Sequence, residues 1–304
     1  MKDLREYQGN PNRIVGQAKM IYSSSGKQTI VVEGDTDLRL YRQWLVSKNA
    51  RLEQANGKKN VKEVWLKAKE LKFANLHCLV DLDYDLELSD SPIIDSQFIY
   101  VSIANSESGL EVECNDLESA LIRSHALIKV MSQKYRLDVL KNNFELKIEG
   151  LREKLRIAGA KIGSVRVVNQ KIWNQTGYAP IGANFQIDEF FFDSINIELN
   201  IDYLSEFLLR GSKGYDVENL IDSANKLLDK NTNGWQLCRG HDLSVMLGMH
   251  LSNLIGRRVS QREIEEDLRL ACELEIIGAT RFGSKLLKIG SASGKPILGV
   301  NNLT

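Results

Sequence analysis

Short apolar runs that alternate with helical segments constrain the fold of this chain most strongly. The runs at residues 29–32, 76–80 and 98–101 have the length and composition of buried strands. Between the first two runs, Val61, Val64 and Ala68 recur at helical spacing, which predicts an amphipathic helix. Strands and helices in alternation favour parallel β-α-β crossovers. The sequence therefore predicts an α/β fold with a mostly parallel sheet flanked by helices.

A change of pattern indicates a second domain. From about residue 134 helical periodicity dominates, and Ser260 with Glu263 has the spacing of a capping box before a further helix. The apolar positions of the first long helical stretch are Leu137, Leu140, Phe144, Ile148, Leu151 and Leu155. We expect an α/β domain over 1–134, including an N-terminal arm. We expect a mainly helical domain over 135–304, which serves dimerisation, substrate or partner contacts.

The composition argues against several classes of protein. The 304 residues carry 40 Lys+Arg and 40 Asp+Glu, so the net charge is zero and no chain-wide positive field attracts nucleic acid. The four cysteines form no CxxC pair, which argues against a zinc ribbon and favours reduced, buried thiols. Neither a signal peptide nor a long apolar run is visible, so we expect a cytoplasmic protein without membrane contacts.

Acidic side chains follow two of the predicted strands. Glu33 comes directly after the first apolar run, and Asp81, Asp83 and Asp85 follow the second. Open α/β sheets bind ligands outside the carboxyl ends of their strands. Because residues two apart in an extended chain point the same way, we expect Asp81 and Asp83 to face one ion.

This crowding of carboxylates predicts a metal site. The acids would repel one another without a cation, and Mg²⁺ accepts a few carboxylates together with water and substrate phosphate. Mn²⁺ is an alternative ion. The competing interpretation is that acids after strands are turn residues or helix caps, which applies above all to Asp35 and Asp37.

Two motifs resemble the signature of the Toprim domain, the Rossmann-like catalytic domain shared by topoisomerases, bacterial primases, small ribonucleases and OLD-type nucleases. They are Glu33-Gly34-Asp35-Thr36-Asp37 and Asp81-Leu82-Asp83-Tyr84-Asp85, and the resemblance covers roughly residues 28–130. It implies a general acid/base role for Glu33, metal binding by Asp81 and Asp83, and a tight turn at Gly34 that lets a phosphate approach. The catalytic set expected on this basis is Glu33, Asp37, Asp81 and Asp83.

A narrower resemblance points to the Toprim proteins encoded beside ABC-type ATPases, such as the AriB nucleases of the PARIS phage-defence system. It rests on the motifs above together with residues 56–61 and 115–118, and on Trp235 and residues 239–243 further along. The group implies an effector that an AriA-like ABC-type ATPase holds inactive. A phage trigger releases the effector, which forms a homodimer and cuts RNA, with tRNA as the expected target.

Several further residues have two open interpretations. Glu118 is either an additional metal ligand or, with Asn115, part of a capping box. Lys58 and Lys59 precede a helix N-terminus, where they either bind phosphate or form a solvated turn. His241 either contacts substrate or stands beside an Asp242 helix cap. The resulting metal set is Glu33, Asp81, Asp83, Asp85 and Glu118, and the substrate-binding set is Gly34, Lys58, Lys59 and His241.

Phosphodiester hydrolysis by a metal-activated site is the function that these residues favour, with water as the nucleophile. Residues 26–29 look like part of a phosphate-binding loop, but the first glycine is missing and a strand follows where a helix is required, so ATP chemistry must come from a partner. Two alternatives stay open. One is a Toprim module that senses a ligand without cutting, and the other is a DNA repair or replication enzyme.

Overall fold

The computed structural model describes residues 9–88, 93, 95–101, 103–106, 109–137, 144–182, 185–212, 216–231, 233–278, 281–291 and 294–299. Internal contacts divide the chain into two compact units. Unit 1 comprises residues 1–82, 92–111 and 273–304, and unit 2 comprises 83–91 and 112–272. Each unit is therefore built from separate stretches of sequence, and each is described by itself.

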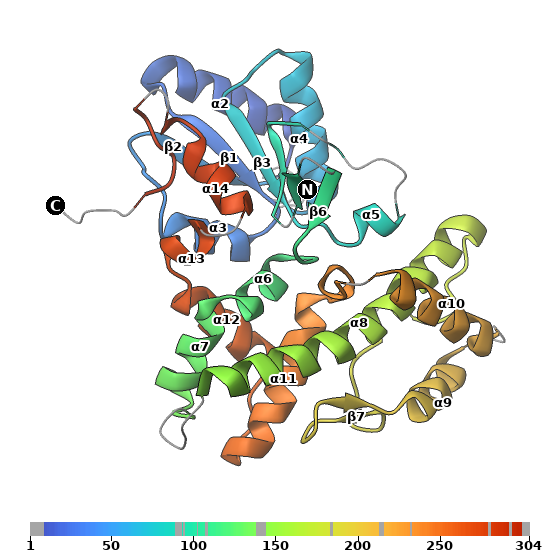
Figure 1. Ribbon diagram of the computed structural model, residues 1–304. Helices are drawn as coiled ribbons and strands as arrows, with labels where there is room; N and C mark the ends of the chain where they lie inside the picture. Colours follow the sequence, from blue (N-terminus) through green and yellow to red (C-terminus); the bar gives the residue numbers. More distant parts are fainter. Residues whose placement is uncertain are drawn as a thin grey trace, which may run out of the picture. The chain divides into compact units, whose positions relative to one another are not determined.

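Unit 1 is built around a four-stranded parallel sheet in the order β2-β1-β3-β4 (Figure 1). Its strands are β1 (Gln28–Val32), β2 (Ala50–Gln54), β3 (Leu76–Val80) and β4 (Phe98–Tyr100). A further two-stranded sheet joins β5 (Ile103–Ser106) to β6 (Gly109–Val112). The helices are α2 (Pro11–Ser25), α3 (Asp35–Arg42), α4 (Lys58–Glu70), α13 (Leu274–Gly278) and α14 (Arg281–Lys288).

Burial explains which strands the sequence reveals. The central strands β1 and β3 are mostly apolar and buried along nearly their whole length, as expected of parallel strands covered on both faces. β2 pairs with β1 at the edge of the sheet, and its sequence Ala-Arg-Leu-Glu-Gln is mostly polar and only partly buried. Edge strands need no apolar run, so β2 was missed by the pattern that predicted β1, β3 and β4.

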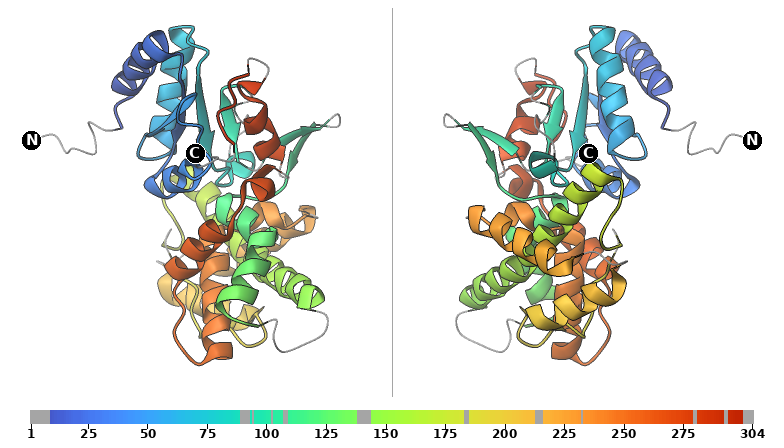
Figure 2. Two further views of the ribbon diagram at one scale, coloured as in Figure 1. Left: turned by 90° about the vertical axis from the view of Figure 1, so that its left-hand side faces the viewer. Right: turned by 90° about the vertical axis from the view of Figure 1, so that its right-hand side faces the viewer.

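Helices cover both faces of the parallel sheet. Figure 2 shows α2 and α4 on one side and α14 on the other. Asn10 caps α2 by accepting the Arg13 N–H at 3.2 Å, Pro11 stands at its first position, and Gly26 ends it with φ 69°. The expected N-terminal arm is thus helical over 11–25, and residues 1–8 lie outside the described residues.

The last part of the described chain returns to unit 1. Asn49 donates a side-chain hydrogen bond to the Pro296 carbonyl at 2.9 Å, and Val46 N–H donates to the Ile297 carbonyl at 2.9 Å. Gly299 N–H donates in turn to the Trp44 carbonyl at 2.9 Å. These bonds attach residues 296–299 to the segment that connects α3 with β2.

Unit 2 is mainly helical. Its elements are α5 (Asp85–Leu88), α6 (Leu117–Arg123), α7 (His125–Lys129), the π-helical turn η1 (Val130–Lys134), α8 (Phe144–Thr176), α9 (Ile201–Gly211), α10 (Val217–Lys230), the 3-10 turn η3 (Trp235–Leu237), α11 (Gly240–Ile255) and α12 (Gln261–Ala271). A short antiparallel pair, β7 (Phe192–Asp193) and β8 (Glu198–Leu199), interrupts the helices. The 33-residue α8 packs against α10, α11 and η3.

The division into units does not coincide with the boundary expected near residue 134. α6, α7 and η1 precede that boundary, yet α6 and α7 pack against α11 or α12 within unit 2. Residues 273–304 follow it, yet belong to unit 1. Helical periodicity reports the secondary structure of a segment and not the partner on which the segment packs, which is why the boundary differs.

The broad fold prediction is confirmed: the chain is α/β, with a parallel sheet flanked by helices and a helical C-terminal part. All four cysteines are buried, and none of them forms a disulfide in the described structure. Of the apolar positions expected in the long helical stretch, Leu151 and Leu155 are buried in α8, whereas Leu140 lies outside the described residues. No helix in the described ranges is both long and apolar enough to cross a membrane.

Candidate functional site

The carboxyl edge of the unit 1 sheet brings Glu33 and Asp81 together. Glu33 follows β1 and Asp81 follows β3, and these two strands are parallel neighbours in which Val31 lies opposite Cys78. The backbone N–H of Asp81 donates to Oε1 of Glu33 at 2.9 Å, although the two residues are 48 positions apart. This bond fixes the Glu33 carboxylate at the end of β3, as the position of the two motifs predicted.

Lys58 reaches the same edge from the start of α4. Its Nζ donates to the Leu82 carbonyl at 2.8 Å, one residue beyond Asp81, and lies 5.8 Å from the centre of the Tyr100 ring. Gly57, with φ 108°, precedes the helix and donates its N–H to the Glu33 carbonyl at 2.9 Å. A positive charge therefore stands beside the carboxylates, whereas Lys59 is exposed to solvent.

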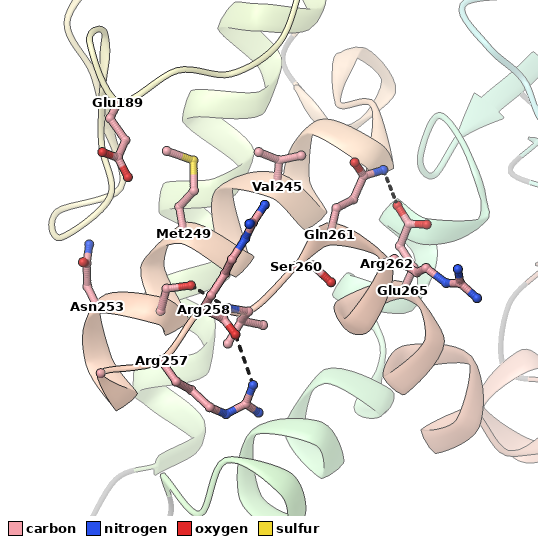
Figure 3. A pocket seen from close by; sticks show the side chains of 13 residues that line it. Glu189, Val245, Met249, Asn253, Arg257, Arg258, Ser260, Gln261, Arg262 and Glu265 are labelled. Atoms are coloured by element: carbon pink, nitrogen blue, oxygen red, sulfur yellow. Dashed lines mark hydrogen bonds between the residues drawn. The ribbon is translucent and has the colours of Figure 1, made fainter.

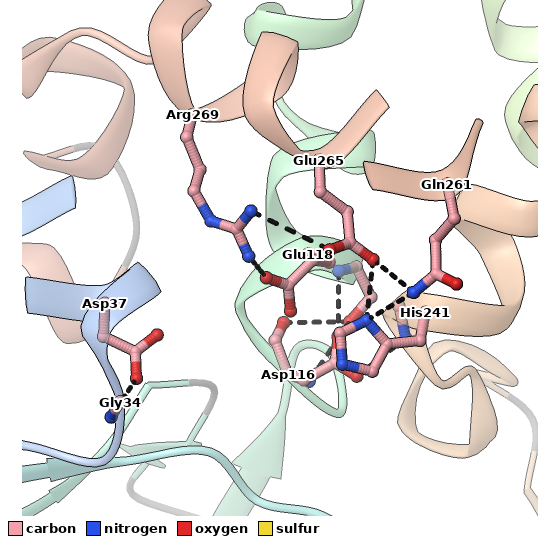
Figure 4. A network of polar contacts seen from close by, with 10 residues as sticks. Gly34, Asp37, Asp116, Glu118, His241, Gln261, Glu265 and Arg269 are labelled. Carbon is pink, nitrogen blue, oxygen red and sulfur yellow. Dashed lines mark hydrogen bonds and ion pairs between the residues drawn. The ribbon is translucent and has the colours of Figure 1, made fainter. Parts of the chain in front are cut away.

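Asp37 acts within the described contacts as a helix cap. It is the third residue of α3, and its Oδ2 accepts the Gly34 N–H at 3.1 Å (Figure 4). This bond satisfies a backbone donor at the helix N-terminus, so a structural role accounts for Asp37 at this position without any catalytic role. The role as cap was the competing interpretation of Asp37, and its placement in the catalytic set stays a prediction.

Gly34 does not form the tight turn expected of it. Its φ of −134° and ψ of 175° are extended values that any residue can adopt. A Cβ at this position would meet only Asp37 Oδ2 at 3.7 Å and Thr36 Oγ1 at 3.8 Å, which are ordinary van der Waals distances. Neither backbone conformation nor internal packing therefore requires glycine here.

Asp83 and Asp85 belong to unit 2, where Asp83 lies in a turn and Asp85 follows it as the first residue of α5. Asp83 has φ 47° and Tyr84 φ 67°, so the chain is not extended through Asp83 and the expected alternation with Asp81 stops at Leu82. Asn115 holds the turn, because its carbonyl accepts the Asp83 N–H at 3.3 Å and its Oδ1 accepts the Tyr84 N–H at 2.9 Å. Left-handed non-glycine residues store backbone strain and concentrate at functional sites.

Glu118 forms a buried ion pair. Its Oε1 contacts the Arg269 guanidinium of α12, and both side chains are about nine-tenths buried. The helix cap is Asp116 and not Asn115, since Asp116 Oδ1 accepts the Ser119 N–H at 2.9 Å and Ser119 Oγ accepts the Asp116 N–H at 3.1 Å. The capping box expected from Asn115 and Glu118 is therefore wrong by one residue. The second interpretation of Glu118, as a metal ligand, stays a prediction.

His241 lies in the same network as Glu118 (Figure 4). Its Nδ1 is 2.6 Å from Oε1 of Glu265, and the Gln261 amide donates to that same oxygen at 2.8 Å. The hydrogen bond with Glu265 raises the pKa of His241, against the lowering effect of burial. The His241 side chain is 45% exposed, so the raised pKa favours the protonated imidazolium at a position that solvent can reach.

The motif around His241 has two further structural roles. Gly240 donates its N–H to Asp116 Oδ2 at 2.7 Å, and a Cβ at Gly240 would overlap Asp116 and Glu118, so only glycine fits. Asp242 does not cap the helix but forms a buried ion pair with Arg166 of α8, with N–O distances of 2.7 and 2.8 Å. The expected Asp242 cap is wrong, since its carboxylate points to α8.

Several residues of this network were not predicted as parts of a site. They are Asn115 in its role at the turn, Asp116, Gly240, Glu265 and Arg269. Arg269 and Glu118 are 151 positions apart, so no local spacing reveals their pairing. The one available signal was the spacing of Gln261, Glu265 and Arg269, which places the three side chains on one face of a helix.

The donor chemistry of unit 1 fits a hard divalent cation. Glu33 and Asp81 offer carboxylate oxygens at one edge, and Mg²⁺ is commonly bound through one or two carboxylates with water and phosphate oxygens. No group of three or more His, Cys, Asp or Glu side chains arranged for a metal ion occurs within the ranges that the structure describes. The argument for a metal ion at this edge therefore rests on two carboxylates, and not on a complete set of protein ligands.

Comparison with known proteins does not assign the chain to a family. A scan against protein-family models and a search of curated proteins both found no match.

Proposed function

We propose that this chain is a Mg²⁺-dependent nuclease whose active site is the carboxyl edge of the unit 1 sheet. The observation that carries the proposal is the hydrogen bond of 2.9 Å from the Asp81 N–H to Glu33 Oε1, which joins the ends of two neighbouring parallel strands. This is the edge at which open α/β sheets bind ligands. The resemblance of both acidic motifs to the Toprim signature supports the same reading.

Each residue of the edge has a chemical role in this proposal. Asp81 binds the metal ion at this edge. Metal binding by Asp83, Asp85 or Glu118 stays a prediction from the sequence. A bound Mg²⁺ would neutralise charge on the phosphate and acidify an attacking water. Glu33, oriented by the Asp81 N–H, accepts or returns the proton of that reaction. Lys58 contributes a positive charge for the phosphate of the substrate.

The first test removes one metal ligand. Asp81→Asn is expected to weaken Mg²⁺ and Mn²⁺ binding by at least about tenfold, since even a lost second-shell partner costs that much, and to abolish cleavage. The fold is expected to survive, because the Asp81 backbone N–H still donates to Glu33. Calorimetric titration with the metal ions, together with cleavage of labelled RNA and DNA in Mg²⁺ and in EDTA, measures both effects.

A matched control distinguishes the metal site from a general loss of negative charge. Asp35→Asn removes an exposed carboxylate of α3 that pairs with Arg39 at 2.7 Å, and it is expected to leave metal binding and cleavage within about twofold. Metal binding that is unchanged in Asp81→Asn would contradict the assignment of Asp81. Metal binding without cleavage of any nucleic acid by the wild type would favour the alternative of a non-cleaving sensor.

The regulatory part of the proposal concerns partners. We infer that an AriA-like ABC-type ATPase holds the chain inactive and that the released protein acts as a homodimer on RNA, with tRNA as the expected target. Support comes from the resemblance to Toprim proteins encoded beside such ATPases and from the zero net charge. Co-purification with a co-expressed ABC-type ATPase, followed by sizing after release, tests this part. A free monomer that cleaves at full rate would contradict it and leave the nuclease proposal intact.

A further inference from the structure

A cavity of about 920 Å³ lies in unit 2 where α11 ends and α12 begins (Figure 3). Its volume is within the range of small-molecule sites. The cavity is lined by three arginines, by two carboxylates and by two apolar side chains that bear on its chemistry: Arg257, Arg258, Arg262, Glu189, Glu265, Val245 and Met249. None of these residues belongs to the proposed nuclease edge, so the cavity is a separate feature of the molecule.

The loop that forms one wall of the cavity is fixed by hydrogen bonds. Ser252 Oγ donates to the Gly248 carbonyl at 2.6 Å and accepts the Val259 N–H at 2.8 Å. Gly256 ends α11 with φ 69°, a conformation that glycine adopts without strain. A Cβ at Gly248 would meet the Val259 carbonyl at 2.9 Å, so the loop also packs closely on α11. The wall is therefore preformed.

The cavity offers positive charge for an anion. Arg257 pairs with Glu263 at 2.9 Å, and Arg262 pairs with Glu266 at 2.7 Å. By contrast, no hydrogen bond or ion pair occupies the guanidinium of Arg258 in the part of the chain that the structure describes. α12 begins at Gln261 in the same wall, so the positive end of the helix dipole adds to this charge.

The remaining walls offer different chemistry. Val245 and Met249 of α11 present apolar and polarisable surface between the charged groups. Glu189 projects toward the cavity from another segment, and its carboxylate is a strong acceptor for hydroxyl groups. A ligand that satisfies all three walls carries an anionic group, an apolar group and a hydroxyl donor.

We propose that this cavity binds a ribonucleoside monophosphate. The phosphate is held by Arg258 and the start of α12, the base lies against Met249 and Val245, and the ribose hydroxyls donate to Glu189. The ligand is either a free nucleotide or the 5′-phosphorylated terminal nucleotide of an RNA chain, since both present the same groups. The inference does not depend on nuclease activity, because binding is measured without metal and without cleavage.

The test compares nucleotides and variants in EDTA. Calorimetry measures binding of AMP, GMP, CMP and UMP, of the corresponding 2′-deoxynucleotides, and of a 5′-phosphorylated RNA hexamer of mixed sequence. The wild type is expected to prefer ribonucleotides by about tenfold. Arg258→Ala is expected to weaken binding by about tenfold to a hundredfold, because a charge-assisted hydrogen bond is lost. Glu189→Ala removes the acceptor for the ribose hydroxyls, and the ratio of ribonucleotide to deoxynucleotide affinity is expected to fall to about one.

Control variants distinguish a specific phosphate contact of Arg258 from unfolding and from a general loss of positive charge. Arg210→Ala removes an exposed arginine of α9 that is no part of the lining, and it is expected to leave binding unchanged. Arg258→Lys keeps the charge and is expected to retain part of the affinity. Melting curves establish that each variant is folded.

The outcomes are distinct. Binding of mononucleotides that depends on Arg258 supports a free nucleotide, and binding of the hexamer alone with the same dependence supports an RNA end. Binding that is unchanged in a folded Arg258→Ala variant, equal affinity for ribo- and deoxynucleotides, or no binding by the wild type would overturn the proposal.

Discussion

Replacing Glu33 with glutamine is expected to lower metal-dependent cleavage by about 10²- to 10⁴-fold, the contribution of a positioned acid or base. Glutamine keeps an oxygen that can accept the Asp81 N–H, so the tie between β1 and β3 survives while the proton-transferring carboxylate is lost. Single-turnover kinetics on a labelled RNA substrate measure the effect. Calorimetry with Mg²⁺ then distinguishes two roles of Glu33. If Glu33 is a metal ligand, the variant binds Mg²⁺ more weakly; if Glu33 only transfers a proton, Mg²⁺ binding is unchanged.

A neighbouring acid provides the control for Glu33. Asp37→Asn keeps a side-chain oxygen that can cap α3 through the Gly34 N–H, so a capping role predicts nearly unchanged stability and cleavage. A comparable loss of cleavage in Asp37→Asn and Glu33→Gln would place Asp37 in the catalytic set after all. Activity of Glu33→Gln within about threefold of the wild type would mean that Glu33 only joins the two strands.

Arg166→Met is expected to lower the free energy of unfolding by about 3–5 kcal/mol, because it leaves the Asp242 carboxylate buried without its partner. The Arg166 and Asp242 side chains are only 8% and 7% exposed, and the guanidinium also donates to the Phe185 carbonyl at 2.8 Å. Urea denaturation followed by circular dichroism measures the loss. The double variant Arg166→Met/Asp242→Leu is expected to recover most of it, since an apolar pair of similar volume often replaces a buried ion pair without cost.

A less buried ion pair on the same helix is the matched control. Arg156 pairs with Glu153 at 2.6 Å, their side chains are 24% and 55% exposed, and Arg156→Ala is expected to cost no more than about 1 kcal/mol. Equal losses in Arg156→Ala and Arg166→Met would contradict the argument from burial. Failure of the double variant to recover stability would mean that Arg166 acts mainly through the Phe185 carbonyl and its packing on the Phe185 ring, 4.2 Å from the guanidinium.

The sequence predicted the unit 1 edge better than the unit 2 network, and the reason is the range of the interactions involved. Glu33 and Asp81 come directly after apolar runs, and parallel pairing of those runs is enough to bring the two acids together. The left-handed turn at Asp83 could not be predicted in this way. It depends on Asn115, a residue that approaches only through tertiary folding.

The packing of Glu118 illustrates the same limit. A local pattern suggested Asn115 as the cap, but Asp116, one position later, performs that role because its side chain accepts the Ser119 N–H. Glu118 is then available to Arg269, which lies on a helix far along the chain. Local spacing predicts which residues begin a helix, but not which distant charge a buried carboxylate meets.

The discontinuous composition of unit 1 has a consequence for how the chain folds as it is synthesised. The sheet and both acids of the candidate edge are encoded before residue 101, whereas the segment at 296–299 that hydrogen-bonds to Trp44, Val46 and Asn49 is made nearly 200 residues later. During translation, unit 1 therefore lacks residues 273–304 until all of unit 2 has been synthesised. A nascent chain of this design carries an unfinished unit 1 for most of its translation, which delays the complete folding of that unit until synthesis has passed residue 299.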